Sequence, residues 1–412
     1  MSDGPRLEVA EVFRQAAEEY LTKYGASPAQ RRVLRDVQNC RTAVLGGHVE
    51  ACDQCGHQRI AYNSCSNRHC PKCQGPARAR WTQARAAELL PVPYFHVVFT
   101  LPEALGPLAL QNQAAVYDVL FRAVGETLLE VAANPKRLGA RIGFLAVLHT
   151  WGQNLMHHPH VHCVVPAGGL SGNGAAWVPG REDFFLPVRV LSRVFRGKFI
   201  AFLKQAIGRG ELKYHGSLAP LADPAAMEQL LDQAVRHHWV VYAKRPFGGP
   251  EAVLKYLARY THRVAISNRR LLRFDGGQVT FSWRDYAHGN RQSTMTVTAV
   301  EFIRRFLLHV LPSGFVKIRY YGFMANRHRR ENLARCRKLL AHTAAAVGDD
   351  APEPTELDPG LPTTPSDNET PEVRCPVCQQ GRMRIIARLD RQLGPKETTV
   401  APSDPVIPPD TS

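Results

Sequence analysis

Four cysteines near the start of the chain form two Cys-x-x-Cys pairs. Cys52 and Cys55 make the first pair, and Cys70 and Cys73 follow after fourteen intervening residues. Each pair can present two thiolates to one side of an ion, and four thiolates satisfy the tetrahedral preference of Zn²⁺. We therefore predict that these four cysteines hold a structural zinc with no open position for chemistry. Further candidate ligands nearby are Cys65, His48, His57 and His69.

A second group of metal-ligand residue types surrounds His160-Val161-His162. Alternate residues of a strand point to the same face, so both imidazoles are expected on one side of a sheet. Two ligands are too few, and Gln153, on the preceding strand, is the expected third. Its neutral amide oxygen favours Mg²⁺ or Mn²⁺, which prefer oxygen ligands. The rivals for the third position are His149, His157 and His158.

Two tyrosines are spaced for nucleophilic chemistry in the segment PEAVLKYLARYTHR, residues 250–263. Tyr256 and Tyr260 are four residues apart, which places both hydroxyls on one face of a helix. A phenol has a pKa of about 10 and is a weak nucleophile alone. It becomes effective when a metal polarises the phosphate under attack and cations hold the nucleic-acid backbone. The expected cations are Lys255, Arg259 and Arg263. A bare tyrosine pair is more often part of a core; its occurrence with the histidine and cysteine motifs favours chemistry.

The composition indicates a polyanionic partner. The chain has 412 residues and a formal net charge of +16, with a pI near 9.6. This charge suits nucleic acid or an anionic membrane surface. No apolar run reaches the ~18 to 20 residues of a membrane span. Ten cysteines in a reducing compartment indicate metal ligands. We therefore expect a soluble, cytoplasmic protein, which would be nucleoid-associated if its polyanionic partner is DNA.

Apolar periodicity and turn residues predict the elements that must position these groups. Expected helices cover 8–24, 28–41, 78–90, 110–133, 188–207, 225–237, 250–263, 300–310 and 326–345. Expected strands cover 94–101, 142–155, 161–166, the segment WVVYAK, and short stretches within 270–298. Lys317 and Arg319, among aromatic residues, are candidates to contact single-stranded DNA; a plain strand is the equal alternative.

The C-terminal part reads as unstructured. Residues 349–372 contain eight acidic residues, six prolines and no Lys or Arg, a composition typical of a disordered linker. Cys375-Pro-Val-Cys378 is half of a zinc-binding pair, and Cys336 is only one possible partner. An unmetallated remnant is at least as plausible there as a second zinc site. No GxxxxGK[ST] motif is present, so no ATP motor is expected.

The motifs together resemble a known family. His160-Val161-His162 resembles the histidine–hydrophobic–histidine (HUH) motif of rolling-circle endonucleases, and Tyr256-Leu-Ala-Arg-Tyr260 resembles the paired tyrosines of their two-tyrosine branch. The pattern CDQCG…SCSNRHCPKCQ is similar to the zinc-binding domain of transposases of the insertion-sequence-91 type. Stretches at 95–102, 260–270 and 281–286 also resemble that family.

The resemblance implies an α+β fold: a small antiparallel sheet flanked by helices, with the histidine strand central and the tyrosine helix packed over it. It implies metal ligation by His160 and His162, more weakly by Gln153, and attack on single-stranded DNA by Tyr256 and Tyr260. The product would be a 5′-phosphotyrosine and a free 3′-hydroxyl, as rolling-circle transposition requires. The expected partners are single-stranded element ends and target DNA.

The expected domains are a helical and zinc-binding DNA-contact domain at 1–90, an HUH endonuclease domain at 91–347, an acidic linker at 348–372 and a C-terminal tail at 373–412. Two other functions stay open at this point. The chain could be a plasmid or phage replication initiator or a relaxase, which use the same chemistry. It could also be a non-catalytic zinc-ribbon DNA-binding regulator, which would need neither tyrosines nor histidines. The sequence leaves the oligomeric state open.

Overall fold

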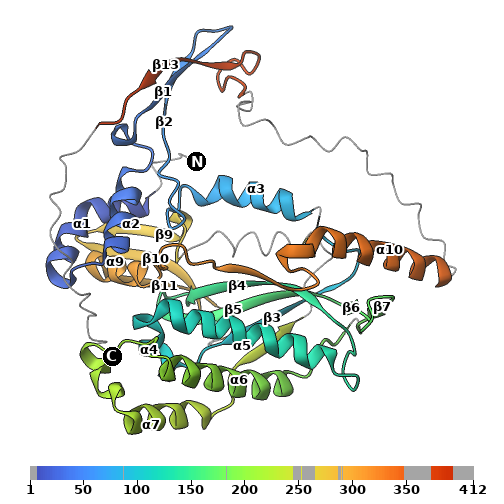
Figure 1. Ribbon diagram of the computed structural model, residues 1–412. Coiled ribbons are helices and arrows are strands. Elements are labelled where there is room, and N and C mark those ends of the chain that lie inside the picture. Colours follow the sequence, from blue (N-terminus) through green and yellow to red (C-terminus); the bar gives the residue numbers. More distant parts are fainter. Residues whose placement is uncertain are drawn as a thin grey trace.

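The computed structural model describes residues 7–86, 88–181, 183–244, 252, 265–285, 289, 291–347 and 373–392. Within these residues the fold is α+β with antiparallel sheets, as expected (Figure 1). No helix in the described part of the chain is both long and apolar enough to span a lipid bilayer.

A five-stranded antiparallel sheet forms the centre of the molecule. Its strand order is β12-β4-β5-β3-β8, which makes β5, the strand of the two histidines, the middle strand as predicted. The strands are β3 (Tyr94–Thr100), β4 (Gly143–Trp151), β5 (His157–Pro166), β8 (Val241–Lys244) and β12 (Ile318–Gly322).

The two faces of this sheet differ in their cover. Helices α5 (Gln113–Ala133) and α6 (Val188–Gly208) pack on one face over buried residues such as Phe99, Val161 and Cys163. On the other face, Trp81 of helix α3 (Gln74–Ala86) packs beside Val147 and Val164. Figure 1 shows α5 and α6 below the sheet and α3 above it. Strand alternation places the histidines of β5 on the α3 side.

The N-terminal helices α1 (Val9–Tyr24) and α2 (Pro28–Asn39) begin at capping boxes. At α2, Gln30 N donates to Ser27 Oγ at 3.3 Å and Ser27 N donates to Gln30 Oε1 at 2.9 Å, which satisfies end groups that a helix leaves unbonded. Both predicted helices are confirmed within two residues at each end.

These helices do not pack apart from the rest of the chain. Phe13 of α1 meets Phe306 of α9 (Ala299–Leu307) edge to face, with ring centroids 5.1 Å apart. The same core includes a second sheet of β9 (Leu271–Asp275), β10 (Gln278–Asp285) and β11 (Arg291–Thr298). The expected boundary at residue 90 is therefore not a boundary of packing, because the N-terminal helices share a core with residues 265–310.

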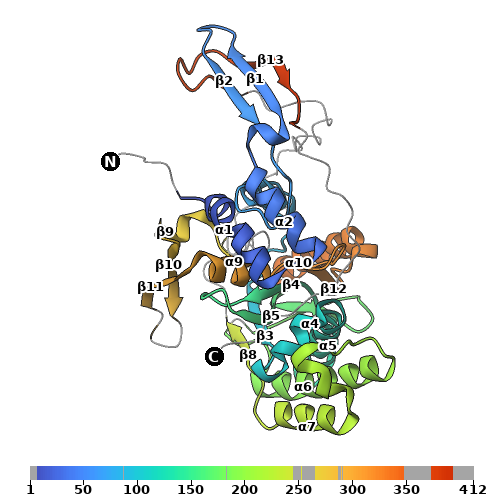
Figure 2. The same ribbon diagram turned by 90° about the vertical axis from the view of Figure 1, so that its left-hand side faces the viewer.

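A three-stranded ribbon projects from this body, as Figures 1 and 2 show. It pairs β1 (Gly47–Cys52) with β2 (Gln58–Tyr62) on one side and with β13 (Met383–Leu389) on the other. The expectation of a disordered tail is thus wrong for residues 373–392, which are part of this ribbon. The linker 348–372 and residues 393–412 lie outside the described residues.

The remaining described α-helices and strands are α4 (Gly106–Gln111), β6 (Gly168–Leu170), β7 (Trp177–Pro179), α7 (Pro224–Val235) and α10 (Arg329–Val347).

Candidate metal centre and zinc clusters

Three histidines converge on one face of the central sheet. His160 and His162 alternate along β5, and the β4–β5 register pairs His149 directly with His160, so all three side chains share that face. Their ligand nitrogens lie within 4.8 Å of one another. His149 and His162 are buried, while His160 is partly exposed. The cluster is thus close enough for one ion to reach all three imidazoles.

The hydrogen bonds of these rings fix how they can bind. His160 Nδ1 donates to the carbonyl oxygen of His158 at 2.6 Å. Nε2 of His160 is then the ring nitrogen whose lone pair can bind a metal ion. His96 of β3 lies beside His162, with its Nε2 2.8 Å from His162 Nδ1 and the two rings stacked at 8°. Histidine ligands of metals are commonly oriented through the second ring nitrogen in this way. His96 was not predicted; period-2 alternation along YFHVVFT would have placed it on this face.

Burial favours the neutral form of His160 and His162. Burial lowers the pKa of His160 to about 4. The positive charge that His158 and His96 would carry when protonated also acts to lower this pKa. The pKa of His162 is lowered well below its usual value, first by burial and then by His149 and His160. Because metal binding needs the unprotonated imidazole, both histidines of β5 are in the form that binds a metal at neutral pH.

The expected position of Gln153 across from the histidine pair is wrong. Strand β4 ends at Trp151 and β5 begins at His157, so Gln153 lies in the connecting turn. Its backbone oxygen accepts a hydrogen bond from Arg270 Nη2. The residue that faces His160 is His149, which the sequence analysis named as a rival.

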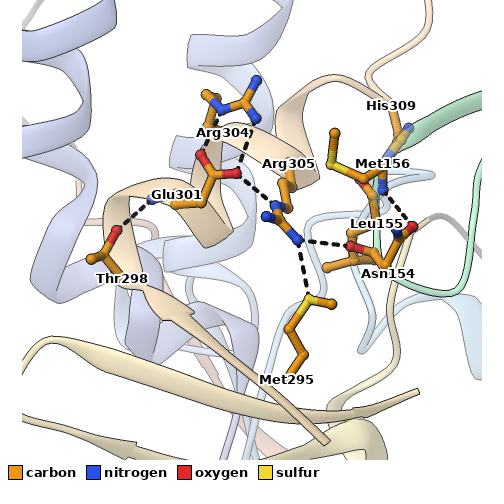
Figure 3. A network of polar contacts seen from close by, with 9 residues as sticks. All are labelled: Asn154, Leu155, Met156, Met295, Thr298, Glu301, Arg304, Arg305 and His309. Atoms are coloured by element: carbon orange, nitrogen blue, oxygen red, sulfur yellow. Dashed lines mark hydrogen bonds and ion pairs between the residues drawn. The ribbon is translucent and has the colours of Figure 1, made fainter. Parts of the chain in front are cut away.

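Figure 3 shows how this turn is held against α9. Arg305 donates from Nη1 to the carbonyl of Asn154 and contacts Met295 Sδ, both at 3.2 Å. Glu301 holds Arg305 in place through a 2.6 Å bond to its Nε. His309 Nε2 donates to the carbonyl of Leu155 at 2.9 Å. The network joins the hairpin of the histidine strands to the core shared with the N-terminal helices.

The predicted nucleophiles cannot be compared with this geometry. Tyr256 and Tyr260, with Lys255, Arg259 and Arg263, lie outside the described residues. Their roles stay predictions.

The ten cysteines include two clusters of four, and neither is the predicted set. Cys40, Cys65, Cys70 and Cys73 form one, and Cys52, Cys55, Cys375 and Cys378 form the other. The grouping of Cys52 and Cys55 with Cys70 and Cys73 is therefore wrong, because the β1–β2 ribbon separates the two pairs. Cys65 was a named candidate. Cys40 was missed because it is a single cysteine that precedes both Cys-x-x-Cys pairs, whereas Cys65 lies between them.

The histidine candidates near the clusters have other partners. His48 Nε2 bonds Glu50 at 3.0 Å. His69 Nδ1 contacts Asn67 Oδ1 at 3.0 Å, and its Nε2 accepts from Leu311 N at 3.3 Å. Neither His48, His57 nor His69 belongs to a cluster of ligand atoms among the described residues.

Arg319 and Lys317, the two expected DNA contacts on β12 and just before it, lie among protein groups. Arg319 lies on the α5 side of the sheet, paired with Asp118 and 4.2 Å above the ring of Phe121. That side is opposite to the histidines, and the expected contact of Arg319 with DNA stays a prediction. Burial, with a smaller contribution from Arg68, lowers the pKa of Lys317 to about 7.

Two family models match the chain. One is described as a putative transposase and matches residues 143–332; the other is described as a transposase zinc-binding domain and matches residues 12–101. The putative transposase y4qJ of Sinorhizobium fredii is 54% identical over 394 residues, which cover 95% of this chain and 97% of that protein. The transposase for insertion sequence element IS801 of Pseudomonas savastanoi pv. phaseolicola is 31% identical over 293 residues, 70% of this chain and 68% of that protein. No solved structure matches the chain.

Proposed function

The chain belongs to the transposases of the insertion-sequence-91 type, and from that premise we propose that it nicks and rejoins single-stranded DNA in rolling-circle transposition. Membership makes it a DNA-processing enzyme with a zinc-binding domain. The proposal adds the chemistry: transient phosphotyrosine bonds made by Tyr256 and Tyr260.

The convergence of three imidazoles on the middle strand carries this proposal. His149, His160 and His162 come from two paired strands, and burial lowers the pKa of His160 and of His162, which favours the neutral form that binds a cation. Nitrogen ligands suit transition ions better than Mg²⁺, which prefers oxygen. Of the two expected ions, the triad therefore favours Mn²⁺. A divalent ion held there would polarise the scissile phosphate.

The covalent step balances without an external energy source. A tyrosine oxygen attacks the phosphorus and gives up its proton, and the bond from phosphorus to the 3′ oxygen breaks. That oxygen takes a proton and leaves as a free 3′-hydroxyl, while the 5′ side stays on the tyrosine. Reversal at a different 3′-hydroxyl rejoins the strand. Two tyrosines allow a second cut while the first still holds DNA.

The test is the formation of a covalent adduct. The full chain is incubated with labelled single-stranded oligonucleotides from the element ends and Mn²⁺ or Mg²⁺, then separated in denaturant. We expect an adduct that the double change Tyr256→Phe/Tyr260→Phe abolishes and that His160→Ala/His162→Ala reduces strongly. Tyr214→Phe is the matched control, because Tyr214 packs against the core formed with α5 and α6. This variant should still form the adduct.

Adducts that persist in the double tyrosine variant would refute the nucleophile assignment. Sequence-specific binding without any adduct, in every variant and with either ion, would favour the non-catalytic regulator instead.

A further inference from the structure

We infer that Cys52, Cys55, Cys375 and Cys378 form a second zinc site, which fastens the C-terminal strand to the N-terminal ribbon. This goes beyond the proposed function and does not rest on it. Cys375 and Cys378 lie outside both matched regions, 12–101 and 143–332. The other cluster, at Cys40, Cys65, Cys70 and Cys73, lies wholly within the zinc-binding match.

The sulfur positions fit a tetrahedral ion. A Zn–S bond of about 2.3 Å places the sulfurs of a regular tetrahedron about 3.8 Å apart. Cys52 Sγ lies 3.7 Å from Cys378 Sγ, and Cys55 Sγ lies 3.7 Å from Cys375 Sγ. All four sulfurs are within 4.8 Å of one another. A disulfide would need about 2.05 Å, so the four positions match a shared ion and not two bridges.

Both Cys-x-x-Cys turns point backbone amides at their first sulfur. Gln54 N and Cys55 N donate to Cys52 Sγ at 3.4 and 3.5 Å. Val377 N donates to Cys375 Sγ at 3.4 Å, so the C-terminal turn has the same arrangement. Gly381 N adds a bond to Cys378 Sγ at 3.3 Å. Amides aimed at sulfur stabilise the thiolate, which is the form that binds zinc.

The two turns are also fitted to each other. Arg382 N donates to Asp53 Oδ1 at 2.8 Å, and Asp53 N donates to the carbonyl of Arg382 at 3.1 Å. A Cβ at position 381 would collide with Cys52 Sγ, so only glycine allows the two turns to approach this closely. Neighbouring residues thus support an arrangement that brings four thiols together.

The site joins segments more than 300 residues apart in the sequence. Cys55 and Cys375 are 320 positions apart, and β13 follows directly and completes the sheet beside β1. One added strand of seven residues is weak by itself. An ion shared by both turns supplies the attachment that the strand pairing alone lacks.

The first experiment counts zinc in the full chain, purified under reducing conditions, by elemental analysis. Because the three-histidine centre could itself take up zinc, every chain counted also carries His160→Ala/His162→Ala. We expect two ions in this background and one after the further change Cys375→Ser/Cys378→Ser. Cys336→Ala, a buried cysteine outside both clusters, is the matched control and should keep two. Gly381→Ala should lower occupancy of the second site while every ligand is still present.

The second experiment remains informative if the cysteine variant folds poorly. A recognition sequence for a specific protease is inserted within 349–372 of the otherwise unchanged chain, which is then cleaved. We expect the C-terminal fragment to stay bound while zinc is present and to leave when a strong chelator is added.

Three results would overturn the inference. The first is a zinc count that Cys375→Ser/Cys378→Ser does not lower. The second is a disulfide between Cys52 and Cys378 in protein purified under reducing conditions. The third is a C-terminal fragment that the chelator does not release.

Discussion

Replacing His96 tests whether the stacked ring beside His162 orients it for a metal. His96 Nε2 lies 2.8 Å from His162 Nδ1, and loss of such an orienting partner typically lowers metal affinity about 10- to 100-fold. That corresponds to about 1.4 to 2.7 kcal/mol of binding free energy. We therefore expect His96→Phe, which keeps an aromatic ring but has no hydrogen-bonding nitrogen, to weaken Mn²⁺ binding by that factor.

The assay is calorimetric titration with Mn²⁺ of a chain whose cysteine clusters hold zinc and from which a weak chelator has removed any ion held by the histidines, so that only the histidine centre contributes. His96→Gln is the informative companion, because its amide can bond His162 Nδ1 and should recover part of the affinity. A residue that only fills space would give equal losses in both variants. Affinity unchanged in His96→Phe would refute the orienting role.

Three further predictions concern the centre and the core that supports it. His149→Ala should reduce Mn²⁺ binding far more than Gln153→Ala, because only His149 faces the cluster; the reverse order in the same titration would restore Gln153 as the ligand. Burial acts to raise the pKa of Glu301, but hydrogen bonds from Arg304 and Arg305 outweigh it and lower that pKa. Its stabilising effect is then present above the unfolded carboxyl pKa of about 4.3 and is lost as the pH falls through the lower folded value. Glu301→Gln should accordingly destabilise the chain by about 1 to 2 kcal/mol at pH 7. In thermal unfolding, the difference in stability between this variant and wild type should shrink below about pH 4. A difference that does not change with pH would contradict this. Phe13→Ala should cost about 3 to 5 kcal/mol in denaturant unfolding, because it empties a fully buried site against α9; a loss below 1 kcal/mol would mean that the α1–α9 contact does not hold the two parts together.

The error over Gln153 shows how a small misreading of strand ends changes a site. Apolar periodicity predicts a first strand that continues to residue 155 and a second that begins at residue 161. The chain instead turns at 152–156, with Leu155 at a φ of +65°. Shifting the turn moves the residue opposite His160 from Gln153 to His149. The position of the turn depends on how Arg305 and His309 hold the hairpin. Both residues lie about 150 positions after the hairpin in the sequence.

The cysteines show the same limit over a longer distance. Spacing correctly marked each Cys-x-x-Cys pair as two ligands on one turn, because a local turn brings both sulfurs together. It did not determine which pairs share an ion. Cys70 and Cys73 join Cys40 and Cys65, while Cys52 and Cys55 meet a pair from the far end of the chain.

The sequence by itself determined most of the local elements and the common face of His160 and His162, and its motifs carried the resemblance to the family, which in turn implied a central histidine strand. These follow from capping residues, period-2 alternation and short motifs, which act over a few residues. Only the tertiary structure decided the third histidine, the orienting role proposed for His96 and the composition of each cysteine cluster. Those depend on strand register and on contacts between distant segments, where the free energy that selects one pairing comes from packing the whole core.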